Sequence, residues 1–167
     1  MPSRLQSMAK GVATVDVKYI NPFVESVDNV FQMMLNVTPQ RQKLKLGTGQ
    51  PNGAAVTSLV GISGKVQGVV VLRLPHETAL ELAKRMLGTE VNVINAEVVD
   101  AVSEIVNMIA GSAKAKFEYD PPLELGLPTV VQGNDYNVKY PSGTTWLEIP
   151  FESEAGNFSM ELTFEEN

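Results

Sequence analysis

The sequence predicts an α+β domain: a two-layer structure in which helices cover one face of an antiparallel sheet, built from two similar halves. Strand-like runs occur in neighbouring pairs joined by Gly-containing turns, which is the signature of antiparallel hairpins. Segments with a helical period separate these pairs. A helix followed by about three strands occurs twice, although residue identity between the two halves is weak. Because turns rather than helices join paired strands, a parallel βαβ sheet is disfavoured.

The composition limits the class of protein. The chain has 167 residues, of which 44% are hydrophobic and 19% charged, as expected for one soluble globular domain. A net charge of -6 argues against a nucleic-acid partner, which requires a basic face. The absence of cysteine excludes disulfides and thiolate metal sites. No apolar run is long enough to span a membrane, and no signal peptide is evident, so we expect a cytoplasmic protein.

The N-terminal half begins with a short segment that lacks any period. We expect residues 1–15 to be a disordered tail or an expression remnant, and residues 16–167 to form a single domain. Asn21 and Pro22 have the types favoured at the N-cap and first position of a helix, so a helix is expected from there to just before Thr38-Pro39. Its core positions would include the Met33-Met34 pair.

The strands of this half and the second helix follow. Residues 43–46 alternate like a short strand, and residues 55–62 and 65–74 form a predicted hairpin around Ser63-Gly64. The β-branched run 69–72 predicts a central strand buried on both faces. A helix should then begin at Pro75 and end at Gly88.

The C-terminal part of the chain contains four further strand-like runs. Residues 129–132 and 136–139 flank Gly133-Asn134, which predicts a hairpin turn. Residues 145–151 and 157–164 alternate on either side of Ala155-Gly156 and predict a second hairpin.

Between the two halves, residues 95–116 predict a long helix with two distinct faces. Its apolar stripe recurs at i, i+4, i+7 and i+11, and consists of Val98, Val102, Ile105 and Ile109. A polar row with the same spacing, Asp100, Glu104, Asn107 and Gly111, falls within a sector of roughly 60° on the other side. The flanks of this row are small residues: Ala96, Ser103, Ala110 and Ala115. On pattern alone, the row is either an ordinary solvent-exposed face or a binding surface.

Other arrangements that could support catalysis are absent from the sequence or weak. The single histidine, His76, follows a proline at a helix start, where a capping or surface role is expected. No glycine-rich phosphate loop opens a helix with the required spacing. Trp146 lies in a predicted strand, where it is expected to belong to the core or an interface. The polar row of the long helix is therefore the best candidate site.

Within this row, Glu104 and Asn107 are i, i+3 neighbours, so their side chains can point at one target. An amide has no useful pKa and cannot act as a general base, but it can hold a water molecule by donating and accepting hydrogen bonds. Positioning a water in line is most of what phosphoryl hydrolysis requires of a protein when a metal and basic groups handle the charge. Since this chain has no evident magnesium cluster or basic clamp, a phosphorylated partner would have to supply them.

The pattern Asp100-x3-Glu104-x2-Asn107, the following Gly111 and the downstream Leu127-Pro-Thr-Val130 resemble the CheC/CheX/FliY family of chemotaxis phosphatases. The opening segment Tyr19-Ile-Asn-Pro-Phe-Val-Glu-Ser-Val-Asp-Asn-Val-Phe31 is similar to the CheX branch in particular. The likeness extends over about residues 17–164.

This resemblance implies hydrolysis of the aspartyl-phosphate of the response regulator CheY. Asn107 would orient the attacking water and Glu104 would contact a lysine of the partner, while Asp100, Ser103 and Gly111 would be supporting partner-binding surface. The magnesium ion would sit in the receiver domain of the regulator, with no cofactor or metal held by this chain, and the protein would be a homodimer. In the first helix, Glu25-x2-Asp28 lacks the amide of a second catalytic pair, which implies one active site per chain.

The sequence is also compatible with two alternative functions. The same helix face could belong to a non-catalytic adaptor or flagellar-switch-type module that binds a receiver domain without accelerating its dephosphorylation. The protein could also be a purely structural dimer domain, in which the polar row is only a solvent-exposed face.

Overall fold

In a computed structural model, the chain is described over residues 17–47, 53–133 and 145–166. The predicted tail at 1–15 and the predicted strand at 136–139 lie outside these residues. The described part contains three helices, α2 (Val17–Leu35), α3 (His76–Leu87) and α4 (Ala96–Ala115), and one antiparallel eight-stranded sheet. The strands are β1 (Gln40–Arg41), β2 (Lys45–Leu46), β3 (Val56–Ser63), β4 (Val66–Leu74), β5 (Glu124–Leu125), β6 (Thr129–Gln132), β7 (Leu147–Glu152) and β8 (Phe158–Glu166).

The sheet is built symmetrically from the two halves of the chain, which confirms the predicted fold class. Its order is β1-β7-β8-β4-β3-β5, with β2 also on β7 and β6 also on β3. If β3 is exchanged with β7, β4 with β8, and the β1–β2 edge with the β5–β6 edge, the order is the same when it is read from the opposite edge of the sheet. Each half therefore contributes a helix, a broken edge strand and a hairpin, and the edge strand of each half pairs with the hairpin of the other. The additional helix α3 connects the halves.

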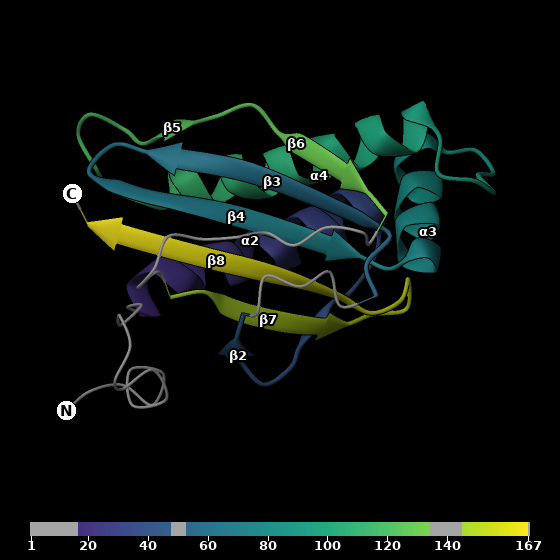
Figure 1. The fold of residues 1–167 in the computed structure, drawn as a ribbon, viewed down its shortest axis with the longest axis horizontal. Helices are drawn as coiled ribbons and strands as arrows, with labels where there is room; N and C mark the ends of the chain where they lie inside the picture. The colour runs from purple at the N-terminus through teal and green to yellow at the C-terminus, as the bar shows by residue number, and fades with distance from the viewer. Residues whose placement is uncertain (1–16, 48–52, 134–144, 167) are drawn as a thin grey trace.

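The helices occupy one face of this sheet, with α2 and α4 running along it and α3 at one end (Figure 1). The core lies between the two layers. Register places Val60, Val70, Leu162 and Leu147 side by side across four strands, and all four are buried. The predicted central strand is confirmed, since β4 lies between β3 and β8 and its residues 70–72 are buried. None of the helices in the described ranges is long and apolar enough to cross a membrane.

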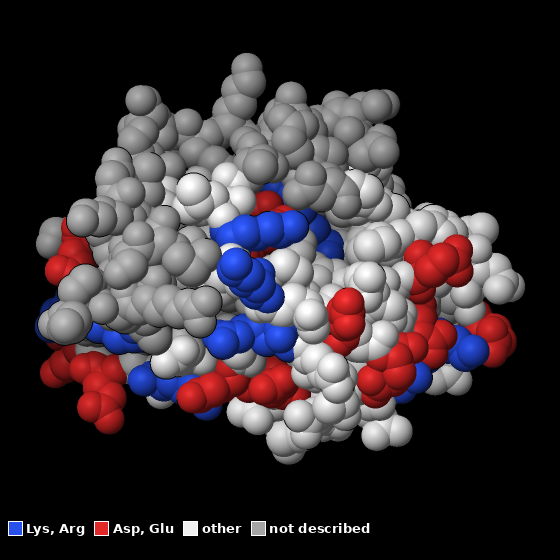
Figure 2. Space-filling view, turned by 90° about the horizontal axis from the view of Figure 1, so that it is seen from below, with Lys and Arg blue, Asp and Glu red and all other residues white. Residues whose placement is uncertain are grey.

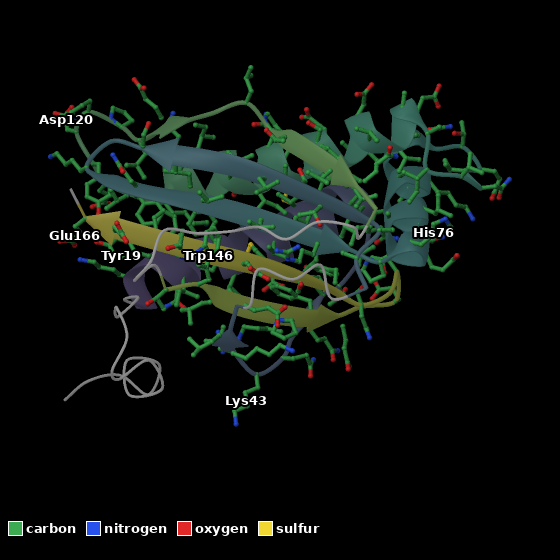
Figure 3. All side chains as sticks on the ribbon, in the orientation of Figure 1. Tyr19, Lys43, His76, Asp120, Trp146 and Glu166 are labelled. Atoms are coloured by element: carbon green, nitrogen blue, oxygen red, sulfur yellow. The ribbon has the colours of Figure 1, made fainter. Side chains whose placement is uncertain are left out.

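The first helix begins at Val17, five residues before the predicted first position Pro22, so the assignment of Asn21 as its N-cap is wrong and Pro22 lies inside α2. Burial explains the additional turn: Tyr19 and Ile20 are buried, and the Tyr19 ring stacks on Phe164 with centroids 5.6 Å apart. Tyr19 and Glu166 meet at the end of the molecule opposite His76 (Figure 3), where the Tyr19 hydroxyl donates a hydrogen bond to the Glu166 carboxylate.

The predicted core position of the methionine pair in α2 is also wrong. Met33 is 83% exposed and Met34 51% exposed, whereas Phe31 and Leu35 on either side are buried. The side of α2 that faces the sheet is thus narrower than the run of apolar residues suggested. His76 is exposed and Trp146 is buried, as predicted.

Two strands differ in detail from the prediction. The strand expected at 43–46 is reduced to Lys45–Leu46, because Arg41 pairs with Phe151 and Lys45 with Glu148, leaving one extra residue on this edge. Just before the extra residue, the backbone N–H of Gln42 donates to the carbonyl of Pro150 at 2.8 Å, and Pro150 has no N–H with which to return the bond. Strand β6 exists as predicted at 129–132, but it pairs with β3; its expected hairpin partner lies outside the described residues.

The sheet face opposite the helices contains buried charges. The Nε atom of Arg73 lies 3.0 Å from a carboxylate oxygen of Glu161, and the two side chains are 2% and 0% exposed. Near the sheet edge, Lys45 pairs with the buried Glu148 at 3.1 Å. Figure 2, a view onto the edge where β2 and β7 lie, shows Lys and Arg side chains gathered at its centre; Arg41, Lys43 and Lys45 are exposed in this segment.

Candidate active site

The candidate site is carried by α4, whose ends are fixed by local chemistry. Asn95 is the N-cap, as predicted, and its side-chain oxygen accepts a hydrogen bond from the backbone N–H of Val98 at 3.0 Å. At the other end, the backbone N–H of Lys116 donates to the carbonyl of Ala113 at 3.0 Å. The helix therefore spans Ala96–Ala115, close to the predicted 95–116.

One side of α4 is fully packed. The predicted stripe is confirmed, since Val98, Val102, Ile105 and Ile109 have no exposed surface. The buried sector is wider than this stripe because α4 contacts α2, α3 and the sheet; it also includes Ala101, Val106, Ala110 and Ala113. The prediction that Ala110 flanks the polar row on the surface is therefore wrong. This packing fixes the rotation of α4 about its axis.

The opposite side of α4 presents the polar row outward. Asp100, Glu104 and Asn107 are exposed, and Gly111 and Ser103 are half-buried. A Cβ atom added at Gly111 would meet nothing within 4 Å, so the surface there is open. The structure thus brings the predicted site residues together on one helix face over three turns.

No base within the described ranges lies within salt-bridge distance of Asp100 or Glu104, and the Asn107 amide has no side-chain partner there. The row consequently presents two uncompensated carboxylates and one uncommitted amide to an incoming molecule. An amide in this position can bind a water molecule, and a carboxylate one turn away can bind a cation. In the part of the chain that the structure describes, no group of three or more acidic or histidine side chains is arranged to hold a metal ion.

The corresponding row on α2 differs. Asn21, Glu25, Asp28 and Gln32 repeat the i, i+4, i+7, i+11 spacing, but Glu25 pairs at 3.6 Å with Lys116, the residue that follows α4. Asp28 is half-buried, and burial raises the pKa of its carboxyl above the usual value. Asp28 stands at the position that corresponds to Asn107, and the charge of Glu25 is neutralised by Lys116. This row therefore offers no equivalent of the Glu104–Asn107 pair.

The sequence does not predict a hollow that lies beside the N-terminal part of the polar row on α4. A hollow of about 550 Å³ borders Glu104 and Asp100 and extends to Met86 and Leu87 at the end of α3. Leu87 is 39% exposed. The helical period of α3 predicts these two residues as core, so only the three-dimensional arrangement reveals that they line an open surface.

Comparison with known proteins agrees with this geometry. Residues 56–152 match the family described as chemotaxis phosphatase CheX. The CheY-P phosphatase CheX of Thermotoga maritima is 27% identical over 127 residues, which cover 75% of this chain and 82% of that protein. The crystal structure of the chemotaxis protein CheX from Vibrio vulnificus superposes with a TM-score of 0.79 at 30% identity, covering 89% of this chain and 99% of that chain.

A third structure shares the fold at lower identity. The CheX chain of a CheX–CheY–BeF3–Mg2+ complex from Borrelia burgdorferi superposes with a TM-score of 0.76 at 22% identity, covering 89% of this chain and 98% of that chain. The matched family segment contains β3, β4, α3 and the whole of α4 with its polar row. The chain belongs to the CheX family of chemotaxis phosphatases.

Proposed function

We propose that this protein hydrolyses the aspartyl-phosphate of a CheY response regulator, with Asn107 and Glu104 as its catalytic residues. The observation that carries the proposal is the outward-facing Glu104–Asn107 pair, one carboxylate and one amide without partners among the described residues, on a helix whose rotation is fixed by packing. The Thermotoga relative, a CheY-P phosphatase, supports the choice of reaction. The Borrelia complex, a CheX bound to CheY, supports the choice of partner.

In this reaction the Asn107 amide holds the attacking water in line with the phosphorus atom. As the water oxygen bonds to phosphorus, the bond from phosphorus to the aspartate oxygen breaks, releasing the receiver's carboxylate and inorganic phosphate, to which the proton of the water passes. Asn107 takes no proton, since an amide is not a base at neutral pH. Its contribution is to position the water, which lowers the entropic part of the barrier.

Glu104 has a different task. Its exposed carboxylate binds a lysine of the receiver domain beside the phosphate, so that α4 is held with Asn107 over the phosphorus. The magnesium ion that neutralises the phosphoryl oxygens belongs to the receiver, as does the remaining basic charge. The supporting surface consists of Asp100, Ser103 and Gly111, which line the same face; at Gly111 the lack of a side chain allows the receiver to approach α4 closely.

The proposal includes the assembly. Residues 16–167 form the single phosphatase domain, which acts in the cytoplasm as a homodimer. The two sheet edges differ: β1–β2 carries Arg41, Lys43 and Lys45, and charges of this kind protect an edge from pairing. The stretch from Leu125 to Gln132, which contains β6, has no charged residue, so pairing of this edge across a two-fold axis is favoured. A monomer mass in sedimentation at working concentration would contradict the dimer.

The direct test is release of phosphate from phosphorylated CheY in the presence of Mg2+. The parent protein should accelerate release well above the spontaneous rate, and the double variant Glu104→Gln with Asn107→Ala should remove the acceleration. If the parent binds phosphorylated CheY without accelerating its decay, the protein is an adaptor. If the double variant changes neither binding nor turnover, the row is only a solvent-exposed face.

A further inference from the structure

The hollow between the end of α3 and the start of α4 continues the surface proposed for catalysis. Its α4 side consists of Glu97, Asp100, Ala101 and Glu104, so two of the residues assigned to the partner interface also line it. Its volume of about 550 Å³ is ample for one long side chain of a bound protein. A receiver that is docked with its phosphate at Asn107 would cover this hollow as well, because it begins at Glu104, less than one turn away.

The floor of the hollow is apolar where α3 ends. The α3 helix stops at Gly88, whose left-handed backbone (φ 72°) allows its N–H to reach the carbonyl of Lys84. This ending leaves Leu87 39% exposed and Met86 half-buried beside α4. Burying such surface against a partner is favourable by roughly 25 cal/mol per Å².

The α4 side of the hollow is acidic. Glu97, Asp100 and Glu104 follow each other along two turns, over about 10 Å of helix axis. The bases of α3 do not compensate them: Lys84 pairs with Glu90 at 3.0 Å and Arg85 with Glu81 at 3.0 Å. None of these three carboxylates forms an ion pair with a base in the described segments. The hollow therefore has an apolar surface on its α3 side and, on its α4 side, three carboxylates without a basic partner among the described residues.

This combination selects one class of side chain. Lysine and arginine carry a long aliphatic stem that packs on apolar surface and a cation that pairs with carboxylates. A purely apolar side chain would leave the three carboxylates unpaired, and an acidic one would be repelled. The occupant expected on chemical grounds is a basic side chain lying along Met86 and Leu87 with its charge toward Glu97 and Asp100.

We propose that the α3–α4 hollow is a specificity pocket that takes a second lysine or arginine of the receiver domain, distinct from the lysine bound by Glu104. The inference rests on the proposed function and adds a determinant of partner choice to it. Since Asp100 and Glu97 lie about 6 and 10 Å along the helix from Glu104, the second base lies at a similar spacing from the phosphate-side lysine on the receiver surface. Receivers that lack a base at this place are poorer substrates.

The test compares steady-state hydrolysis of phosphorylated CheY by the parent, Glu97→Gln and Leu87→Ser. Each variant should raise KM by about threefold to tenfold and leave kcat unchanged, because the pocket binds the receiver away from the reacting atoms. The increase for Glu97→Gln should shrink at high salt, which screens the lost charge pair. Glu152→Gln and Leu46→Ser, on the β7 and β2 edge, are matched controls and should leave KM as in the parent.

Binding of CheY carrying beryllofluoride, an acyl-phosphate mimic, is measured for the same set, so that the pocket is tested independently of turnover. Each basic residue of CheY is then replaced by alanine in turn. For one of these CheY variants, Glu97→Gln should cause no further loss of affinity. The pocket proposal would be overturned if KM and affinity were unchanged in both pocket variants, or if no basic residue of CheY showed this dependence on Glu97. The phosphatase assignment would still stand in that case, provided that Asn107→Ala is inactive. Conversion of a dimer to a monomer by Leu87→Ser would assign the hollow to a second copy of this chain and overturn the proposal as well.

Discussion

At the scale of single residues, the proposed site depends on side chains that fold stability does not require. Glu104 and Asn107 are exposed, and within the described ranges neither has a partner to orient it. Their relative position comes from the helix: three residues apart, their Cβ atoms are about 5–6 Å apart and both point outward. This pairing could be predicted from the sequence, since a strong apolar stripe fixes which side of a helix is buried. The chemistry assigned to the pair came from the family likeness.

Gly111 gives a residue-scale prediction in which stability and binding change in opposite directions. Gly111 is half-buried, but a Cβ atom at this helical position meets nothing within 4 Å, and alanine is favoured over glycine inside a helix by about 1 kcal/mol. Gly111→Ala should therefore raise the free energy of unfolding by roughly 0.5–1 kcal/mol in a urea titration. Because the receiver approaches α4 closely there, the same change should weaken binding of mimic-loaded CheY. A more stable variant with unchanged affinity would show that Gly111 lies outside the interface.

Asp28 gives a prediction about pH. Burial raises the pKa of its carboxyl in the folded state, so folding favours its neutral form; its contribution to stability is present below the unfolded pKa and lost as pH rises through the folded pKa. Asp28→Asn should therefore stabilise the protein at pH 7, by less than about 1 kcal/mol because the group is partly solvated. Urea titrations from pH 7 down to about pH 4 should show this difference narrowing. A difference that is constant with pH would contradict the assignment.

At the scale of elements, α4 is the platform of the site and its ends could be predicted from local chemistry. The Asn95 cap and the apolar period predicted its boundaries almost to the residue, and Gly88 did the same for the end of α3. Elements that depend on distant contacts were predicted less well. The first turn of α2 packs through Tyr19 on Phe164, 145 residues away, and the extra residue of the β1–β2 edge is defined only by the pairing of this edge with β7. Neither partner is visible from the local pattern.

The cap of α4 can be tested by itself. Asn95→Ala removes the hydrogen bond to the Val98 N–H and should lower the free energy of unfolding by about 0.5–2 kcal/mol. Asn92→Ala, an exposed position in the α3–α4 connection, is the control and should change stability much less. Urea titration measures both, and equal effects of the two substitutions would show that the cap bond contributes little to the stability of α4.

At the scale of the whole molecule, two halves exchange edge strands around the central β4–β8 pair. The repeat could be inferred from the order of elements, but not the way in which each edge strand joins the hairpin of the other half, because pairing partners are far apart in the chain. The buried charges on the sheet face opposite the helices likewise depend on strand pairing between residues that are far apart in the chain. Arg73 and Glu161 lie on β4 and β8, separated by 88 positions, and only the sheet register brings them together.

This buried pair gives a prediction for global stability. Removing one partner leaves the other charge buried, so Arg73→Ala or Glu161→Ala should each lower the free energy of unfolding by about 3–5 kcal/mol. The double variant Arg73→Met with Glu161→Leu should cost much less than the sum of the two, because neither member of the pair is then left buried without the other. Lys18→Ala, at the exposed pair with Glu166, is the control and should cost less than about 1 kcal/mol. Additive losses in the double variant would contradict coupling between the two charges.

The central claim, that Asn107 positions the attacking water, is tested most directly by separating turnover from binding in the Asn107→Ala variant. At saturating protein, the single-turnover rate of phosphate loss from phosphorylated CheY should fall by about a hundredfold or more, corresponding to roughly 2.7 kcal/mol of barrier. The affinity of the same variant for beryllofluoride-loaded CheY should stay within about twofold of the parent, because the amide contributes to the transition state rather than to docking. A variant that hydrolyses the phosphate at the parental rate, or that loses rate only because it no longer binds CheY, would contradict the claim.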